Sequence, residues 1–430
     1  MRVLMFGWEF PPHIAGGLGT ACEGIVKGLA HNGVETIFVM PAASGDEDQS
    51  CATILNASDV AVEHASDTVE EFLDKVKFIN VDSNIVPYVN PDEYFEAIET
   101  MKREHVRKTT VGFGQKFKFS GKYGADLLEE VSRYAQVGGT IAMQHAGEVD
   151  VIHAHDWLTY LAGIAAKELS GKPLVVHVHA TSFDRGSDDM VDTRVYAIEK
   201  RGMEAADRVV TVSDLTRNIV INKYGIDPDK VVTVHNAVDF SGRENLSVER
   251  GIKDKVVTFL GRITFQKGPE YFIEAAAKVL KRTKNVRFVM AGSGDMMQRA
   301  IRQVARLGIS DRFHFTGFLR GQEVQKMFAL SDVYIMPSVS EPFGISPLEA
   351  MRSNVPSIIS HQSGAAEVLK YALKVDFWDV DAMADDIYAL LQYPALADFA
   401  NRQGFDEVNA LKWNNATAKL KKVYESVVNQ

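Results

Sequence analysis

The chain has 430 residues, too many for one ordinary domain, and we expect two domains of roughly 200 residues each. Its formal net charge of −10 excludes the broad basic surface that a nucleic-acid binder requires. The cysteines, Cys22 and Cys51, lack the spacing of a metal site or disulfide framework, so we expect a cytoplasmic protein. No apolar run approaches about 18 residues, so we expect no membrane span.

Short strands rich in Val and Ile alternate with helical segments along the chain. In the first half, the pattern predicts strands at residues 2–7, 36–41, 76–81, 151–155, 174–179, 208–212 and 231–235. In the second half, it predicts strands at residues 256–261, 286–291, 312–316, 333–336 and 356–359. Apolar strands separated by helices are typical of parallel sheets covered on both faces. We therefore predict an α/β protein with two Rossmann-like domains.

The polar, helix-poor segment 236–253 separates the two series of strands and is the best candidate for a linker. We expect an N-terminal domain at residues 1–240, a C-terminal domain at residues 241–400 and a final segment at residues 401–430. The residues from Trp413 onward in that segment have the apolar spacing of a helix. Ligands of open α/β sheets bind beyond the carboxyl ends of the strands, so two facing sheets would form an interdomain cleft.

The first predicted strand leads into a glycine-rich turn and then into a helix predicted at residues 20–31. Adjacent glycines, Gly16 and Gly17, let the backbone approach a ligand closely, and the start of a helix favours an anion. Many turns between a strand and a helix need glycine for steric reasons alone. The turn therefore indicates an anion site only in combination with other signals.

Two predicted strands carry paired histidines, His153 with His155 and His177 with His179. Residues two apart on a strand share a face, so each pair could supply half of a metal site. This pattern supports a rival function, a metal-dependent hydrolase, although the further ligands of such a site cannot be placed. The alternative is that His153 and His177 are packed in the core.

Turns after strands of the second half carry further candidate ligand-binding residues. Arg262 and Lys267 flank one turn and could grip a diphosphate together, or could be ordinary surface cations. The segment 292–294, Gly-Ser-Gly, looks like part of a dinucleotide fingerprint, but Met297 occupies the third glycine position. We interpret that segment as a tight turn. Phe318 is a candidate wall for a nucleobase, or a core residue.

The segment 338–351 carries two carboxylates, Glu341 and Glu349, around a turn from a buried strand into a helix. Such a turn aims backbone N–H groups and the positive helix end at one point, which suits a phosphate. With Glu341 in the turn and Glu349 in the helix, one carboxylate could contact a sugar and the other a ribose, with a diphosphate between them. The alternative is a surface loop with two solvated glutamates.

A basic, aromatic stretch at residues 101–123 interrupts the alternation of strands and helices. In an acidic protein it could contact a carbohydrate acceptor, anionic lipid or another subunit. The alternative is a solvated excursion from the first domain.

The Glu-Pro-Phe-Gly and Pro-Leu-Glu-Ala-Met sequences within 338–351 resemble the donor-site signature of retaining glycosyltransferases of the GT-B fold. Family 4 and the glycogen and starch synthases are the closest groups. Glycogen synthases usually have a Lys two residues before the glycine pair, and bacterial ones an Asp after the last glycine. Here Ile14 and Thr20 stand at those positions. The departure weakens the likeness to ADP-glucose enzymes and favours the broader family 4.

This resemblance implies roles for the candidate residues, and a final helix that returns to the first domain. Glu341 would hold sugar hydroxyls and Glu349 ribose hydroxyls, while Asp156 would lie by the acceptor. His179 would contact the donor sugar. The implied catalytic set is Glu341, His179, Asp156, Arg262 and Lys267. The implied donor-binding set is Gly16, Gly17, Arg262, Lys267, Phe318, Phe343, Gly344, Ile345, Ser346 and Glu349.

The prediction is a retaining transferase that moves a hexose, glucose in the first instance, from a nucleotide-diphosphate sugar to an acceptor hydroxyl. An α-glucan or oligosaccharide of glycogen type is the expected acceptor, and neither a metal nor another cofactor is expected. The choices between ADP- and UDP-sugar and between monomer and homo-oligomer stay open, and membrane contact is not expected. The alternatives are a surface-glycan or lipopolysaccharide transferase with a lipid-linked acceptor, the metal-dependent hydrolase, and a sugar-nucleotide epimerase of the same fold.

Overall fold

The computed structural model describes the chain except residues 15, 65, 76–113, 125, 187–190, 239–247 and 430. The strand predicted at residues 76–81 lies outside the described residues. The chain divides into two compact units, the first formed by Met1–Ala237 with Trp413–Gln430 and the second by Val238–Lys412. Across the described part of the chain, every helix is too short or too polar to cross a bilayer.

The first unit contains a sheet whose described strands are all parallel, in the order β3-β2-β1-β4-β5-β6-β7. The strands are β1 (Arg2–Phe6), β2 (Glu35–Met40), β3 (Thr53–Asn56), β4 (Val151–His155), β5 (Leu174–Val178), β6 (Arg208–Thr211) and β7 (Val231–Thr233). The helices are α1 (Gly17–His31), α2 (Asp67–Lys75), α4 (Leu127–Gln144), α5 (Trp157–Ser170), α6 (Ser182–Arg185), α7 (Thr193–Ala205), α8 (Asp214–Tyr224) and α16 (Trp413–Val428). Single 3₁₀ turns are η1 (Ala57–Asp59) and η3 (Pro228–Lys230).

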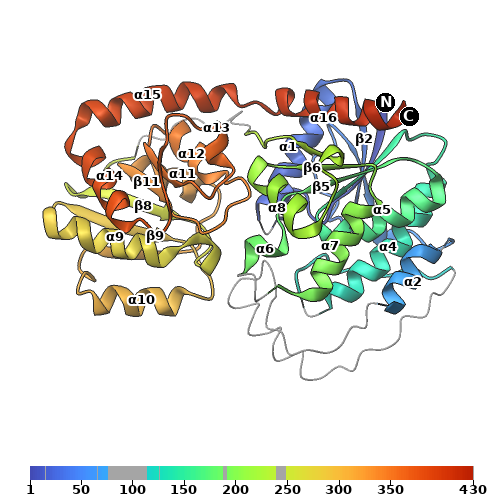
Figure 1. Cartoon of the computed structure of the whole chain (residues 1–430), viewed down its shortest axis with the longest axis horizontal. Helices are drawn as coiled ribbons and strands as arrows, with labels where there is room; N and C mark the ends of the chain where they lie inside the picture. Colours follow the sequence, from blue (N-terminus) through green and yellow to red (C-terminus); the bar gives the residue numbers. More distant parts are fainter. Residues whose placement is uncertain are drawn as a thin grey trace. The chain divides into compact units, whose positions relative to one another are not determined.

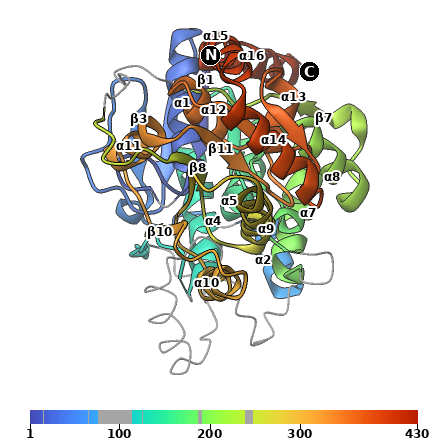
Figure 2. The same cartoon turned by 90° about the vertical axis from the view of Figure 1, so that its left-hand side faces the viewer.

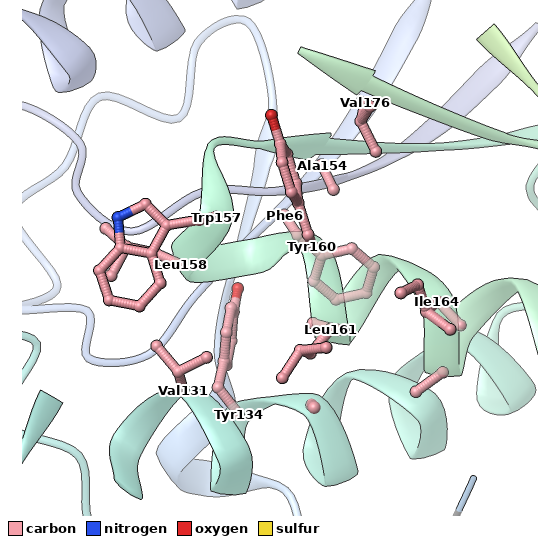
Figure 3. Packing of buried hydrophobic residues seen from close by; sticks show 14 of the residues in the cluster. Phe6, Val131, Tyr134, Ala154, Trp157, Leu158, Tyr160, Leu161, Ile164 and Val176 are labelled. Carbon is pink, nitrogen blue, oxygen red and sulfur yellow. The ribbon is translucent and has the colours of Figure 1, made fainter. Parts of the chain in front are cut away.

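Apolar side chains cover both faces of this sheet. Along β1, Leu4 and Phe6 join one hydrophobic cluster, whereas Val3 and Met5 join another, as the two-residue period of a strand requires. Helices α4, α5 and α7 cover the first of these faces, and α1 and α16 cover the second (Figure 1). Figure 3 shows α5 between the strands and α4, with its Tyr160 reaching toward the sheet. Burial on both faces explains the nearly continuous apolar runs of the strands.

The last helix, α16, packs against α1 in the first unit. Two glycines of α1 make this close approach possible, because a Cβ at Gly24 would lie 2.2 Å from the Trp413 ring and one at Gly28 would lie 2.6 Å from the Thr417 hydroxyl. Asn32 donates side-chain hydrogen bonds of 2.9 Å to Thr417 Oγ1 and to the Asn414 carbonyl. The predicted return of the final helix to the first domain is confirmed.

The second unit is built on a parallel sheet with the described strand order β10-β9-β8-β11-β12-β13. The strands are β8 (Lys255–Leu260), β9 (Val286–Ala291), β10 (Phe313–Gly317), β11 (Val333–Met336), β12 (Ser357–Ser360) and β13 (Leu373–Val375). The helices are α9 (Pro269–Arg282), α10 (Met297–Arg306), α11 (Gln322–Leu330), α12 (Ser346–Arg352), α13 (Ala365–Val368), α14 (Val380–Gln392) and α15 (Pro394–Ala410), with a 3₁₀ turn η4 (Phe265–Lys267).

The core of the second unit also lies on both faces of its sheet. Val257 and Phe259 of β8 face a cluster that includes residues of α9, α10 and α14, whereas Val256 faces Met327 of α11. Helices α9 and α14 lie side by side (Figure 2). Two parallel sheets with helices on both faces confirm the predicted α/β fold. The sequence pattern missed β3 and β13, and α1 begins at Gly17, three residues before the predicted start.

Candidate functional site

The loop after β8, which carries Arg262, is packed against the loop after β9. The Ile263 N–H donates to the Ser293 carbonyl at 2.8 Å. A Cβ at Gly292 would lie 1.8 Å from the Gly261 carbonyl oxygen, and one at Gly294 would lie 2.3 Å from that of Ile263. Both glycines are therefore needed for close backbone packing. This contact accounts for the Gly-Ser-Gly sequence as a tight turn that supports its neighbouring loop.

The turn that carries Lys267 is held against the carboxyl end of β11. Gly268 has a left-handed conformation with φ of 64°, and a Cβ at this position would lie 2.1 Å from the Pro337 carbonyl oxygen. The Val339 N–H donates to the Gln266 carbonyl at 2.9 Å. The start of α9 and the segment leading to Glu341 are thus joined by backbone contacts.

Lys267 and Glu341 form an ion pair at this junction. Their side chains are 19% and 9% exposed, so both are partly withdrawn from water. Backbone hydrogen bonds of 2.9 Å hold Glu341 to Gln362 and Gly364 on the next loop. Arg262 donates to the Gln266 side-chain oxygen at 3.0 Å, which places a second cation on the same turn as Lys267. Three of the predicted site residues therefore lie on two joined loops.

The turn between Glu341 and α12 depends on one glycine. Gly344 has a φ of 90°, and a Cβ there would lie 3.0 Å from the Met336 sulfur and 3.1 Å from the Glu341 side chain. The Phe343 ring is buried, and its carbonyl accepts from the Ala365 N–H at 2.7 Å. Phe343 therefore supports the turn through its ring, which leaves only its backbone to face a ligand.

Helix α12 begins at Ser346, directly after Ile345, and carries Glu349 in its first turn. The Ser346 side chain hydrogen-bonds the buried Tyr334 hydroxyl of β11. Burial raises the pKa of the Tyr334 phenol, and the negative charges of Glu341 and Glu349 raise it further. Both glutamates therefore lie near the end of β11, as the sequence pattern predicts.

Phe318 lies on the loop after β10 and is 57% exposed. The Arg320 guanidinium lies over its ring, 5.3 Å from the ring centroid. An exposed aromatic ring of this kind can stack on a flat base. The alternative that Phe318 belongs to the core is excluded by its exposure.

In the first unit, Asp156 joins the ends of β4 and β5. Its backbone has a positive φ of 56°, and its carboxylate accepts N–H bonds from His179 at 2.7 Å and Ala180 at 3.3 Å. Burial raises the pKa of Asp156 to about 7, although the Arg185 charge and the two N–H bonds oppose the rise. Asp156 is therefore a buried residue whose carboxylate holds the backbone at His179 and Ala180 in place.

His179 is partly buried, and its Nε2 lies 2.9 Å from Nδ1 of His155. Burial lowers the pKa of His179 to about 3, so its ring is neutral at physiological pH. A neutral imidazole can donate or accept a hydrogen bond, but it carries no positive charge. This suits a contact with a sugar hydroxyl better than neutralisation of a phosphate.

The other three histidines, His153, His155 and His177, are fully buried, and one ring nitrogen of each lies within 4.8 Å of the others. Burial lowers the pKa of all three rings. A hydrolytic metal must keep a coordination position that substrate can reach. Because these rings are closed off from solvent, the cluster does not provide the open centre that the rival hydrolase needs.

The glycine loop of the first unit is held by a residue that sequence reasoning missed. Gly16 precedes α1 and Gly17 begins it, while the buried Glu9 carboxylate accepts the Gly19 N–H at 3.1 Å. A Cβ at Gly19 would lie 2.4 Å from the Ile14 side chain. Glu9 therefore already occupies one of the N–H groups at the start of α1 that could otherwise bind an anion. A carboxylate shortly before a glycine-rich helix start was the available signal.

The aromatic residues in the described part of the basic stretch belong to the core. Within the described residues 114–123, Phe117, Phe119 and Tyr123 are buried in the first unit, and the lysines between them are exposed. These rings are therefore not available for docking. Residues 101–113 lie outside the described part of the chain.

Two family models match adjoining parts of the chain. Glycosyltransferase Family 4 matches residues 122–241, and Glycosyl transferases group 1 matches residues 243–404. The chain belongs to the GT-B glycosyltransferases of family 4. The loop with Arg262 and Lys267 and the segment with Glu341 both fall within the second match.

Curated relatives of this glycosyltransferase align along nearly its whole length. An uncharacterized glycosyltransferase of Methanocaldococcus jannaschii is 27% identical, with 99% of this chain and 98% of the relative covered. A glycogen synthase of Mycobacterium tuberculosis is 22% identical over 99% of this chain and 94% of its own. A D-inositol 3-phosphate glycosyltransferase of Catenulispora acidiphila is 28% identical over 74% and 79% of the two chains.

Solved structures of other proteins share the fold of this glycosyltransferase. Sucrose-phosphate synthase of Thermosynechococcus elongatus matches with a TM-score of 0.69 and 16% identity over 99% of this chain and 98% of its own. HepE of Anabaena, in complex with UDP and glucose, matches with a TM-score of 0.66 and 16% identity over 99% and 100% of the two chains. These likenesses agree with the two parallel sheets described above.

Proposed function

We propose that this glycosyltransferase moves glucose from a nucleotide-diphosphate sugar to a growing α-glucan of glycogen type, with retention of the anomeric configuration. The observation that carries the proposal is the junction at which Lys267 pairs with Glu341 and Arg262 lies on the same turn. Two cations and a carboxylate at the carboxyl ends of parallel strands match the needs of a sugar diphosphate.

The leaving diphosphate gathers negative charge as the bond to the sugar breaks. Close backbone packing holds the turn that carries Arg262 and Lys267, so both cations are placed where they can neutralise this charge. A bound diphosphate would compete with Glu341 for Lys267. Glu341, once released, can accept hydrogen bonds from sugar hydroxyls, and Glu349 can accept those of the ribose.

The chemistry follows by analogy with the family. The acceptor hydroxyl attacks the anomeric carbon from the face that the leaving phosphate occupies, and a phosphate oxygen takes the hydroxyl proton as the old glycosidic bond breaks. This step needs no metal ion or other cofactor. His179 would contact the donor sugar through its neutral ring, and Asp156, which braces His179, would lie by the acceptor.

The choice of acceptor rests on the likeness to a glycogen synthase, together with the sequence resemblance. Another relative is named for D-inositol 3-phosphate, so membership of the family alone does not choose the acceptor. Three aromatic rings of the basic stretch, those of Phe117, Phe119 and Tyr123, are buried, so these rings do not support docking on a lipid surface.

A panel of ADP- and UDP-hexoses tests the proposal. Each donor is offered with maltooligosaccharides, with D-inositol 3-phosphate, or with lipid-linked oligosaccharides in vesicles, and released nucleotide is measured. We expect nucleotide release that depends on maltooligosaccharide and on a glucose donor. Release that depends only on one of the other acceptors would overturn the glucan assignment and leave the transferase assignment intact.

A further inference from the structure

We propose that His153, His155 and His177 bind one structural zinc ion inside the first unit. His153 and His155 share a face of β4 because they are two residues apart, and the sheet register places His177 of β5 directly beside His155. One ring nitrogen from each histidine lies within 4.8 Å of the other two. The three imidazoles thus form one compact group of nitrogen ligands.

Unpaired nitrogens point to a ligand in this group. Among the described residues, Nε2 of His153, Nε2 of His155 and both ring nitrogens of His177 are buried without a hydrogen-bond partner. Buried polar atoms of folded proteins are almost always paired. Three neighbouring imidazoles with unpaired nitrogens therefore call for a shared partner that is absent from the polypeptide.

The remaining nitrogens of two of these rings have hydrogen-bond partners that fix how the rings are turned. Nδ1 of His153 lies 2.8 Å from the Tyr424 hydroxyl of α16, and Nδ1 of His155 lies 2.9 Å from Nε2 of His179. Hydrogen bonds to the second ring nitrogen fix the orientation of a ligating histidine. These contacts leave Nε2 of His153 and of His155 for the ion.

The chemistry and burial of the group select a structural role. Imidazole suits zinc among the common divalent ions, which it binds through Zn–N bonds of about 2.0–2.1 Å. The three rings are at most 1% exposed, so no substrate can reach the ion. Its effect would be to hold β4, β5 and, through Tyr424, helix α16 together.

The test measures metal content and stability, independently of transfer activity. Tag-free protein is produced with and without zinc in the growth medium, desalted, and analysed for bound metal and thermal midpoint. We expect about one zinc ion per chain, a higher midpoint for the zinc-containing protein, and loss of bound zinc in His177→Asn. His314→Gln, which changes an exposed histidine of the second unit, should keep the zinc.

Cobalt substitution in the wild-type protein tests the site even if His177→Asn fails to fold. Wild-type protein produced with Co²⁺ should show the visible absorption of a nitrogen-coordinated site if the cluster binds metal. Wild-type protein that contains no zinc when grown with zinc, shows no midpoint change and binds no cobalt would overturn the proposal. The unpaired nitrogens would then be served by buried water.

Discussion

Lys267 and Glu341 are 74 residues apart in the chain and form an ion pair where the start of α9 meets the loop after β11. The pair depends on Gly268, whose missing side chain allows the backbone to approach Pro337. It joins a cation suited to a diphosphate with a carboxylate suited to sugar hydroxyls. The proposed transfer reaction is organised around this pair.

Glu341→Gln should remove most transfer activity. Hydrogen bonds to a charged acceptor contribute about 1.5–3 kcal/mol each, which corresponds to roughly 10- to 150-fold in rate for each sugar hydroxyl. The amide also loses the ion pair with Lys267. Steady-state kinetics should show the loss, while Glu425→Gln, an isosteric change at an exposed glutamate of α16, should behave as wild type. Full turnover in folded Glu341→Gln would remove Glu341 from the mechanism.

Arg262→Ala and Lys267→Ala should each lower kcat/KM by about 10²-fold or more, because each removes a preorganised contact to the leaving diphosphate. Lys281→Ala removes an exposed cation from the far end of α9 and should leave kcat/KM unchanged. Comparable losses in all three variants would indicate a general effect of charge rather than a diphosphate site.

Treatment of the folded enzyme with a chelator should leave the transfer rate unchanged, because the two cations replace a metal at the diphosphate. Rates are measured before and after exposure to EDTA, with thermal midpoints recorded on the same samples. Activity that disappears while the midpoint is unchanged, and returns when Mg²⁺ or Mn²⁺ is added, would place a metal in the reaction and contradict this mechanism.

Gly268→Ala should be more harmful than Gly308→Ala, although both glycines have left-handed backbone, with φ of 64° and 67°. Each alanine incurs about 1–2 kcal/mol of backbone strain. Only at position 268 does the new Cβ meet another group, the Pro337 carbonyl, and overpacking adds about 1–3 kcal/mol. Denaturant unfolding measures the difference, and the donor KM should rise in Gly268→Ala alone. Equal effects of the two substitutions would show that the contact with Pro337 is unimportant.

Periodicity predicted the central strands because burial on both faces leaves nearly continuous apolar runs, as in β4 and β5. The edge strands β3 and β13 escaped prediction because they are short and only partly buried, so their composition does not stand out. The family resemblance identified Glu341, Lys267 and Arg262 as site candidates. Their mutual arrangement depends on contacts between distant loops, which no local pattern contains.

Glu9 and Gln266 were also missed. Glu9 acts through one hydrogen bond to Gly19, across a turn whose path the sequence does not specify. Gln266 holds Arg262 with its side chain and the β11 loop with its carbonyl, and its residue type gives no sign of either role. The sequence predicts which residue types a site needs, while the fold decides which side chains position them.

Analysis of the product made from maltooligosaccharides and a glucose donor tests the account most directly. Mass spectrometry should show chains lengthened by single glucose units, and proton NMR of the new linkage should show the α configuration of the donor. Glu341→Gln should yield little of this product under the same conditions. Unextended chains with every nucleotide-glucose donor, or a β-linked product, would contradict the proposal of retaining glucan elongation.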